Sequence, residues 1–259
     1  MSDSMRDKIK EELSSLNALV KEYGGVDSYT TTQATQLFTL LCKIMHKLGL
    51  NPENRADFFE GSRVIFNLQF VNMGDYSHGR YIFVPNHVSE FDGLLFGTII
   101  PNILVVAKSD WVSNPQLNGF IEKLFAVVGL IRKDSASGMN VLRKCVEHLK
   151  GSPDSAVTIF AQQTIADIEA TKPEDVASGA FYIAKRADAQ IVPVYYEQVS
   201  LEEPTRIVFG SPIVCTNKNE FGEAWLRCEK ELRDSISNPG ARPPVLCEKH
   251  RKPISEREF

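Results

Sequence analysis

The chain has 259 residues, 43% of them hydrophobic and 24% charged, so it can form one large domain or a domain with a small extension. A net charge of −4 gives no global sign of nucleic-acid binding. The five cysteines include no Cys-x-x-Cys pair, which argues against a disulfide framework or zinc site and favours free thiols in a reducing compartment.

The first eight residues are polar and lack the apolar core of a signal peptide. No apolar run in the sequence is long enough to span a bilayer. We therefore expect a cytoplasmic protein, with peripheral membrane association left open.

Two amphipathic helices are predicted at the start of the chain, over residues 5–22 and 32–48. Apolar residues recur at three- and four-residue spacing in the first, and the second carries a broad apolar face. One interpretation is that both helices pack on the main domain. The other is that they form a surface that faces lipid or an acyl chain, and periodicity does not separate the two.

Strands and helices alternate after residue 60. This order predicts an α/β fold, with a mixed central sheet flanked by helices. The tail over 238–259 has four prolines and is expected to be irregular. The predicted strands are 64–66, 81–84, 103–106, 130–131, 156–160, 191–196 and 207–209, and the predicted helices are 92–100, 117–128, 138–149, 179–186 and 221–236.

His87 stands between a predicted strand and a predicted helix, and Asp92 falls in the first turn of that helix. Ligands of open α/β sheets bind at this end of the strands. A carboxylate on one imidazole nitrogen fixes the tautomer and leaves the other nitrogen free to act as a base. Ser89 and the first N–H groups of the helix could hold a phosphate or a developing oxyanion. A lone His and Asp five residues apart is also common on ordinary surfaces.

Three co-linear blocks surround this pair. Val84-Pro-Asn-His-Val-Ser-Glu-Phe-Asp92 resembles the first signature of the glycerolipid acyltransferase (PlsC-like) family, Asn-His-x-Ser-x-x-Asp. Ala107-Lys108 together with Gly129-Leu-Ile-Arg132 resembles the second block, and Ile191-Val-Pro-Val194 resembles the fourth. The resemblance spans roughly residues 80–196 and is far more specific than the pair alone.

The resemblance implies a glycerol-3-phosphate acyltransferase-like fold over residues 51–237, with residues 1–50 as a helical extension. It also implies His87 as general base, Asp92 as its partner, and acyl-CoA or an acyl carrier protein as donor, with no metal, other cofactor or nucleic acid. A lipid, small alcohol or amine would be the acceptor. The candidate substrate-binding residues are Asn86, Ser89, Lys108, Arg132, Gln162, Gln163 and Thr164. Arg132 and Lys108 could equally be solvated surface cations.

The third block departs from the family pattern. Where the family has Phe-Pro-Glu-Gly-Thr-Arg, this chain has Phe160-Ala-Gln-Gln-Thr-Ile165. The family arginine contributes to binding of the acceptor phosphate, and isoleucine cannot replace its two-pronged hydrogen bonding. The segment that follows is acidic, although such a stretch is commonly a solvated loop.

Three hypotheses follow from this departure. The acceptor could be a neutral hydroxyl or a cationic amine instead of a phosphate monoester. The chain could instead still act on a lysophospholipid, with Arg132 and Lys133 binding the phosphate. Finally, it could be a non-catalytic relative that binds acyl groups or a carrier protein, although retention of both His87 and Asp92 counts against this. We therefore expect an acyltransferase that uses His/Asp general-base catalysis on a thioester donor.

Overall fold

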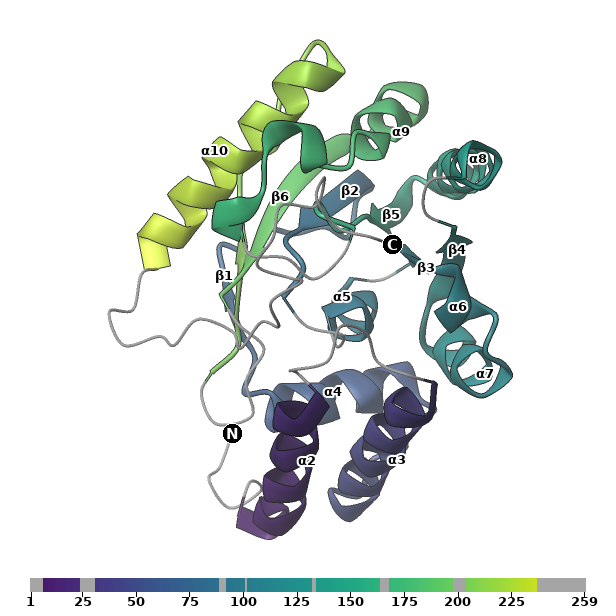
Figure 1. The fold of residues 1–259 in the computed structure, drawn as a ribbon, viewed down its shortest axis with the longest axis vertical. Coiled ribbons are helices and arrows are strands. Elements are labelled where there is room, and N and C mark those ends of the chain that lie inside the picture. The colour runs from purple at the N-terminus through teal and green to yellow at the C-terminus, as the bar shows by residue number, and fades with distance from the viewer. Residues whose placement is uncertain are drawn as a thin grey trace.

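The computed structural model describes residues 7–23, 31–88, 92–100, 102–131, 134–163, 168–197 and 204–236. Within these residues, seven strands form one sheet in the order β1-β7-β6-β2-β5-β3-β4 (Figure 1). Neighbouring strands are parallel except for β6 and β7, so the predicted mixed α/β sheet is confirmed. The strands are β1 (Gln69–Val71), β2 (Gly79–Pro85), β3 (Ile103–Lys108), β4 (Ala126–Leu130), β5 (Asp154–Thr158), β6 (Gln190–Tyr196) and β7 (Arg206–Phe209).

Helices cover both faces of the sheet (Figure 1). One core joins the sheet to α2–α5 and α7, and the other joins it to α8, α9 and α10. The helices are α2 (Lys10–Tyr23), α3 (Thr31–Lys47), α4 (Arg55–Ile65), α5 (Asp92–Ile99), α6 (Ser109–Val112), α7 (Pro115–Leu124), α8 (Ser135–Gly151), α9 (Gly179–Ala187) and α10 (Lys218–Ile236), with short 3₁₀ turns η1 (Ile168–Ala170) and η2 (Pro173–Asp175).

Strand β2 lies between β5 and β6 and carries the site. Its side chains alternate, because Phe83 enters the core with α5 whereas Ile82 and Val84 enter the core with α9 and α10. Burial on both faces explains the unbroken apolar run of this strand. The indole Nε1 of Trp225 on α10 donates a 2.8 Å hydrogen bond to the carbonyl of Val84, which ties α10 to the end of β2.

The two N-terminal helices pack against the main core (Figure 1). Leu16 of α2 and Leu41 of α3 are fully buried, and Phe38 makes an edge contact with Phe120 of α7. The interpretation that these helices pack on the main domain is therefore confirmed, whereas lipid contact stays a prediction. Among the described residues, no helix is both long enough and apolar enough to cross a membrane.

Two predicted elements are wrong. The stretch 64–66, predicted as a strand, forms the last residues of α4 and its C-cap, because Phe58, Ser62 and Ile65 bury one face of this helix. The Asn54 side chain caps the start of the helix at Ala56 and Asp57. Residues 126–128, predicted as part of a helix, belong to strand β4, which pairs with β3. The tail over 238–259 lies outside the described residues.

Candidate active site

The predicted dyad lies at the carboxyl edge of the sheet, at the end of central strand β2. The strand ends at Pro85, His87 follows it, and Asp92 is the first residue of α5. The prediction that a strand precedes His87 and a helix starts at Asp92 is confirmed. A carboxylate in the first turn of a helix is favoured by the unpaired N–H groups there.

The side chains of His87 and Asp92 are hydrogen-bonded. Nδ1 of His87 lies 2.9 Å from Oδ2 of Asp92, and that oxygen also accepts a 2.7 Å hydrogen bond from the backbone N–H of Val88. Asp92 is fully buried, whereas 17% of the His87 side chain is exposed. With an ionised carboxylate against Nδ1, a neutral imidazole donates from Nδ1 and leaves the lone pair of Nε2 free. This arrangement suits a base that faces substrate with one nitrogen.

The ring of Phe160 packs against one face of the His87 imidazole. The two ring centroids are 4.6 Å apart with an interplanar angle of 32°, and Phe160 is buried. The sequence showed that this phenylalanine is retained in the third block but gave no sign of its contact with His87. Because the ring face is packed and Nδ1 is bonded, the imidazole has little rotational freedom.

Asn86 joins the ends of two strands. Its Nδ2 donates to the carbonyl of Tyr196 at 3.0 Å, and its Oδ1 accepts from the backbone N–H of Tyr196 at 2.6 Å. The Tyr196 side chain is also fully buried, and burial together with the nearby Asp92 charge raises its pKa well above the usual value. Contact between Asn86 and substrate stays a prediction, and the structure uses this amide to fix β2 against β6.

The altered third block lies directly against the dyad. Gln162 is buried, its Oε1 accepts a 2.8 Å hydrogen bond from the backbone N–H of His87, and its Nε2 donates to Oγ1 of Thr171 at 3.3 Å. Gln163 is exposed and has a positive φ of 56°. The structure therefore brings Gln162 to the dyad through the backbone of His87.

Lys108 lies at the same edge, at the end of β3, and its Nζ is 2.7 Å from a carboxylate oxygen of Asp110. This ion pair offsets part of the positive charge that the resemblance assigns to acceptor binding. Three further candidates, Ser89, Arg132 and Thr164, lie outside the described residues. Their roles stay predictions.

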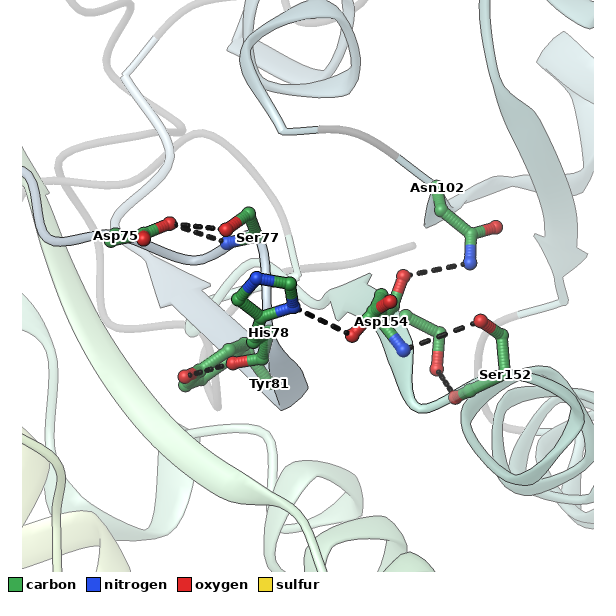
Figure 2. Close-up of polar contacts among 8 residues, drawn as sticks. Asp75, Ser77, His78, Tyr81, Asn102, Ser152 and Asp154 are labelled. Carbon is green, nitrogen blue, oxygen red and sulfur yellow. Dashed lines mark hydrogen bonds and ion pairs between the residues drawn. The ribbon is translucent and has the colours of Figure 1, made fainter.

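A second His–Asp pair, shown in Figure 2, lies at the amino ends of β2 and β5, the edge of the sheet opposite the dyad. His78 precedes β2, Asp154 begins β5, and Nδ1 of His78 is 3.5 Å from Oδ1 of Asp154. The exposed fractions are 85% for His78 and 49% for Asp154. Sequence spacing did not relate these two residues, and their exposed contact serves as an internal control for the buried dyad.

Among the described residues, no group of three His, Cys, Asp or Glu side chains could hold a metal ion. Burial raises the pKa of the Cys145 thiol to about 12, so this cysteine stays protonated near neutral pH. The hydrogen-bonded pair of His87 and Asp92 has a geometry that suits proton transfer through the imidazole.

Comparison with known proteins identifies the family. The model of the Acyltransferase family matches residues 66–197, just over half of the chain, so this chain belongs to that family. The match includes β2, the dyad, the third block and β6. The chain is also similar to the crystal structure of the 1-acyl-sn-glycerophosphate (LPA) acyltransferase PlsC from Thermotoga maritima, with 14% sequence identity and a TM-score of 0.49 over 90% of this chain and 100% of that one.

Proposed function

We propose that this protein transfers an acyl group from a thioester, either acyl-CoA or an acyl carrier protein, to a hydroxyl or amine. The single observation that supports this proposal best is the buried Asp92 carboxylate on Nδ1 of a partly exposed His87. A carboxylate in that place orients the ring and stabilises the imidazolium that forms during the reaction. The proposal makes His87 the catalytic base.

In the proposed reaction, Nε2 of His87 takes the proton from the acceptor hydroxyl or amine as the acceptor attacks the thioester carbonyl. The new C–O or C–N bond forms, the C–S bond breaks, and the imidazolium returns the proton to the leaving sulfur. No covalent enzyme intermediate is required. The Asp92 carboxylate accepts hydrogen bonds from Nδ1 and from the N–H of Val88, and it stabilises the imidazolium while the ring holds the proton.

We further propose that the acceptor lacks a phosphate monoester. Two observations on the described residues support this: the Gln162 amide is committed to protein groups, and Lys108 is paired with Asp110. The family arginine is replaced by Ile165. An isoleucine offers phosphate no hydrogen bond, and the Asp110 carboxylate competes with phosphate for Lys108, so this region is a poor site for a doubly charged group.

The first test compares two histidine substitutions in turnover. We expect His87→Ala to lower kcat by about 10²- to 10⁴-fold, because it removes the base. His78→Ala, the matched control, removes the exposed pair at the opposite edge and leaves kcat unchanged.

Thiol release from acyl-CoA or acyl carrier protein is measured with a panel of acceptors, and mass spectrometry identifies the product. Full activity in His87→Ala would refute the mechanism, and no thiol release with any acceptor would favour a binding role.

The second test concerns the acceptor. Glycerol 3-phosphate and lysophosphatidate are added to a reaction that uses the acceptor found in the panel. We expect neither compound to inhibit at micromolar concentration, because Ile165 replaces the family arginine and Lys108 is paired with Asp110. Competitive inhibition at micromolar concentration would instead support the lysophospholipid hypothesis, with Arg132 and Lys133 binding the phosphate.

A further inference from the structure

The backbone around His87 has three successive N–H groups with three different partners. The N–H of Asn86 bonds to the carbonyl of Val194 on β6, and the N–H of Val88 bonds to the Asp92 carboxylate. Between them, the N–H of His87 bonds to Oε1 of Gln162. Each bond comes from a different element, so the direction of the His87 side chain depends on all three.

The segment after β5 brings Gln162 to this position. The pairing of β5 with β2 continues beyond the strand, because the N–H of Ile159 bonds to the carbonyl of Phe83 and the N–H of Ala161 bonds to the carbonyl of Pro85. The next residue, Gln162, therefore arrives beside His87. Phe160 from the same segment packs on the imidazole face, so one turn holds both the ring and the backbone of His87.

We propose that Gln162 is a positioning residue, whose side-chain oxygen fixes the backbone of His87 in the orientation that its ring needs for catalysis. This inference rests on the proposed role of His87 as base. It differs from the substrate contact expected from the sequence, because Gln162 is 1% exposed and both ends of its amide have protein partners. Displacement of a base by a fraction of an ångström lowers the rate of proton transfer without weakening acceptor binding.

The neutral amide of Gln162 also keeps a second negative charge away from the His87 imidazole. Asp92 is the described carboxylate that faces the ring, and the buried Tyr196 hydroxyl lies on the adjacent strand β6. A glutamate at position 162, as in the family pattern, could accept the same hydrogen bond but would add a second negative charge beside the imidazole. Negative charge favours the protonated ring, so a carboxylate here would require a higher pH for the base to be free.

The test separates positioning from substrate contact by the split between kcat and KM. Gln162→Met keeps the length of the side chain but removes the acceptor oxygen, and we expect a 10- to 100-fold loss of kcat with the acceptor KM within about twofold of wild type. Gln162→Glu restores the oxygen, and we expect kcat within about threefold of wild type at high pH. The acid limb of its pH–rate profile is expected to move up by about one pH unit.

The matched control is Gln190→Met. Gln190 is exposed at the amino end of β6, on the opposite edge of the sheet, so this substitution should leave kcat and the acceptor KM unchanged. Circular dichroism and thermal melts establish that each variant is folded. Should Gln162→Met fail to fold, Gln162→Glu still distinguishes a positioning role from a substrate contact. A substrate contact would change the acceptor KM at every pH. Wild-type kcat in Gln162→Met, or a tenfold rise in acceptor KM with kcat retained, overturns the inference.

The two proposals fail in different ways. Full activity of His87→Ala refutes His87 as base whatever Gln162 does. An inactive His87→Ala together with wild-type kcat in Gln162→Met leaves the proposed function intact and refutes only the positioning role.

Discussion

Gln163 adopts a left-handed backbone conformation, with φ of 56°, at the position where the family pattern has glycine. Its N–H bonds to the carbonyl of Phe160 and closes the turn that carries Gln162 to His87. A side chain with a Cβ is disfavoured in this conformation by roughly 1–2 kcal/mol. The altered third block therefore places a residue with a Cβ in a conformation that favours glycine, at a cost in stability.

We expect Gln163→Gly to stabilise the protein by about 0.5–1 kcal/mol, because it relieves this strain, less the added entropy of glycine in the unfolded chain. The melting temperature should rise by about 1–4 °C. Gln163→Ala is the matched control, since alanine keeps the Cβ and should give no such gain. Differential scanning calorimetry measures both variants, and equal melting temperatures for the two would show that the turn is unstrained.

At the scale of elements, the two residues of the dyad are close in sequence, whereas the other contacts of the site depend on the order of strands in the sheet. His87 and Asp92 are five residues apart across one strand–helix junction, so their contact is local, and the co-linear blocks around them singled out the pair. Gln162 is 75 residues from His87, and Tyr196 is 110 residues from Asn86. Both contacts depend on β5 and β6 flanking β2, and the sequence predicted a mixed sheet without its strand order.

The wrong elements have a related cause. Val64 and Ile65 are β-branched and suggested a strand, but Phe58, Ser62 and Ile65 are buried at helical spacing on one face of α4. Tertiary packing of that face overrides the weaker preference of individual residues. In the same way, residues 126–128 follow the apolar period of α7, and their pairing with β3 is a long-range contact that periodicity does not show.

At the scale of the whole molecule, α10 covers one face of the sheet and buries an acidic residue there. Glu229 is 2% exposed and lies on the helix that also carries the buried Trp225. Burial raises the pKa of Glu229 to about 7, against the opposing effect of Arg233, whose Nε is 3.4 Å from Oε1 of Glu229. Negative charge on Asp234 and Glu169 adds to the increase in pKa.

This burial makes the stability of the fold depend on pH. Folding raises the pKa of Glu229 from 4.5 to about 7, so the folded state binds the proton more tightly than the unfolded state. The stability that this proton contributes to the folded state is fully present below pH 4.5 and is lost as the pH rises through about 7. Glu229→Gln should therefore raise the free energy of unfolding at pH 8 by about 2–3 kcal/mol and change it little at pH 4.5. Arg233 keeps its second partner, Glu169, at 3.2 Å in this variant.

Urea unfolding at pH 4.5 and pH 8 measures this effect in wild type, in Glu229→Gln and in the control Glu231→Gln, which changes an exposed carboxylate on the same helix. The control should keep the wild-type difference between the two pH values, since its side chain remains in solvent. A Glu229→Gln variant with the same pH dependence as wild type would mean that Arg233 compensates the buried charge completely. Because α10 is tied to β2 through Trp225 and Val84, the Glu229→Gln gain at pH 8 should extend to β2, the strand that ends just before His87.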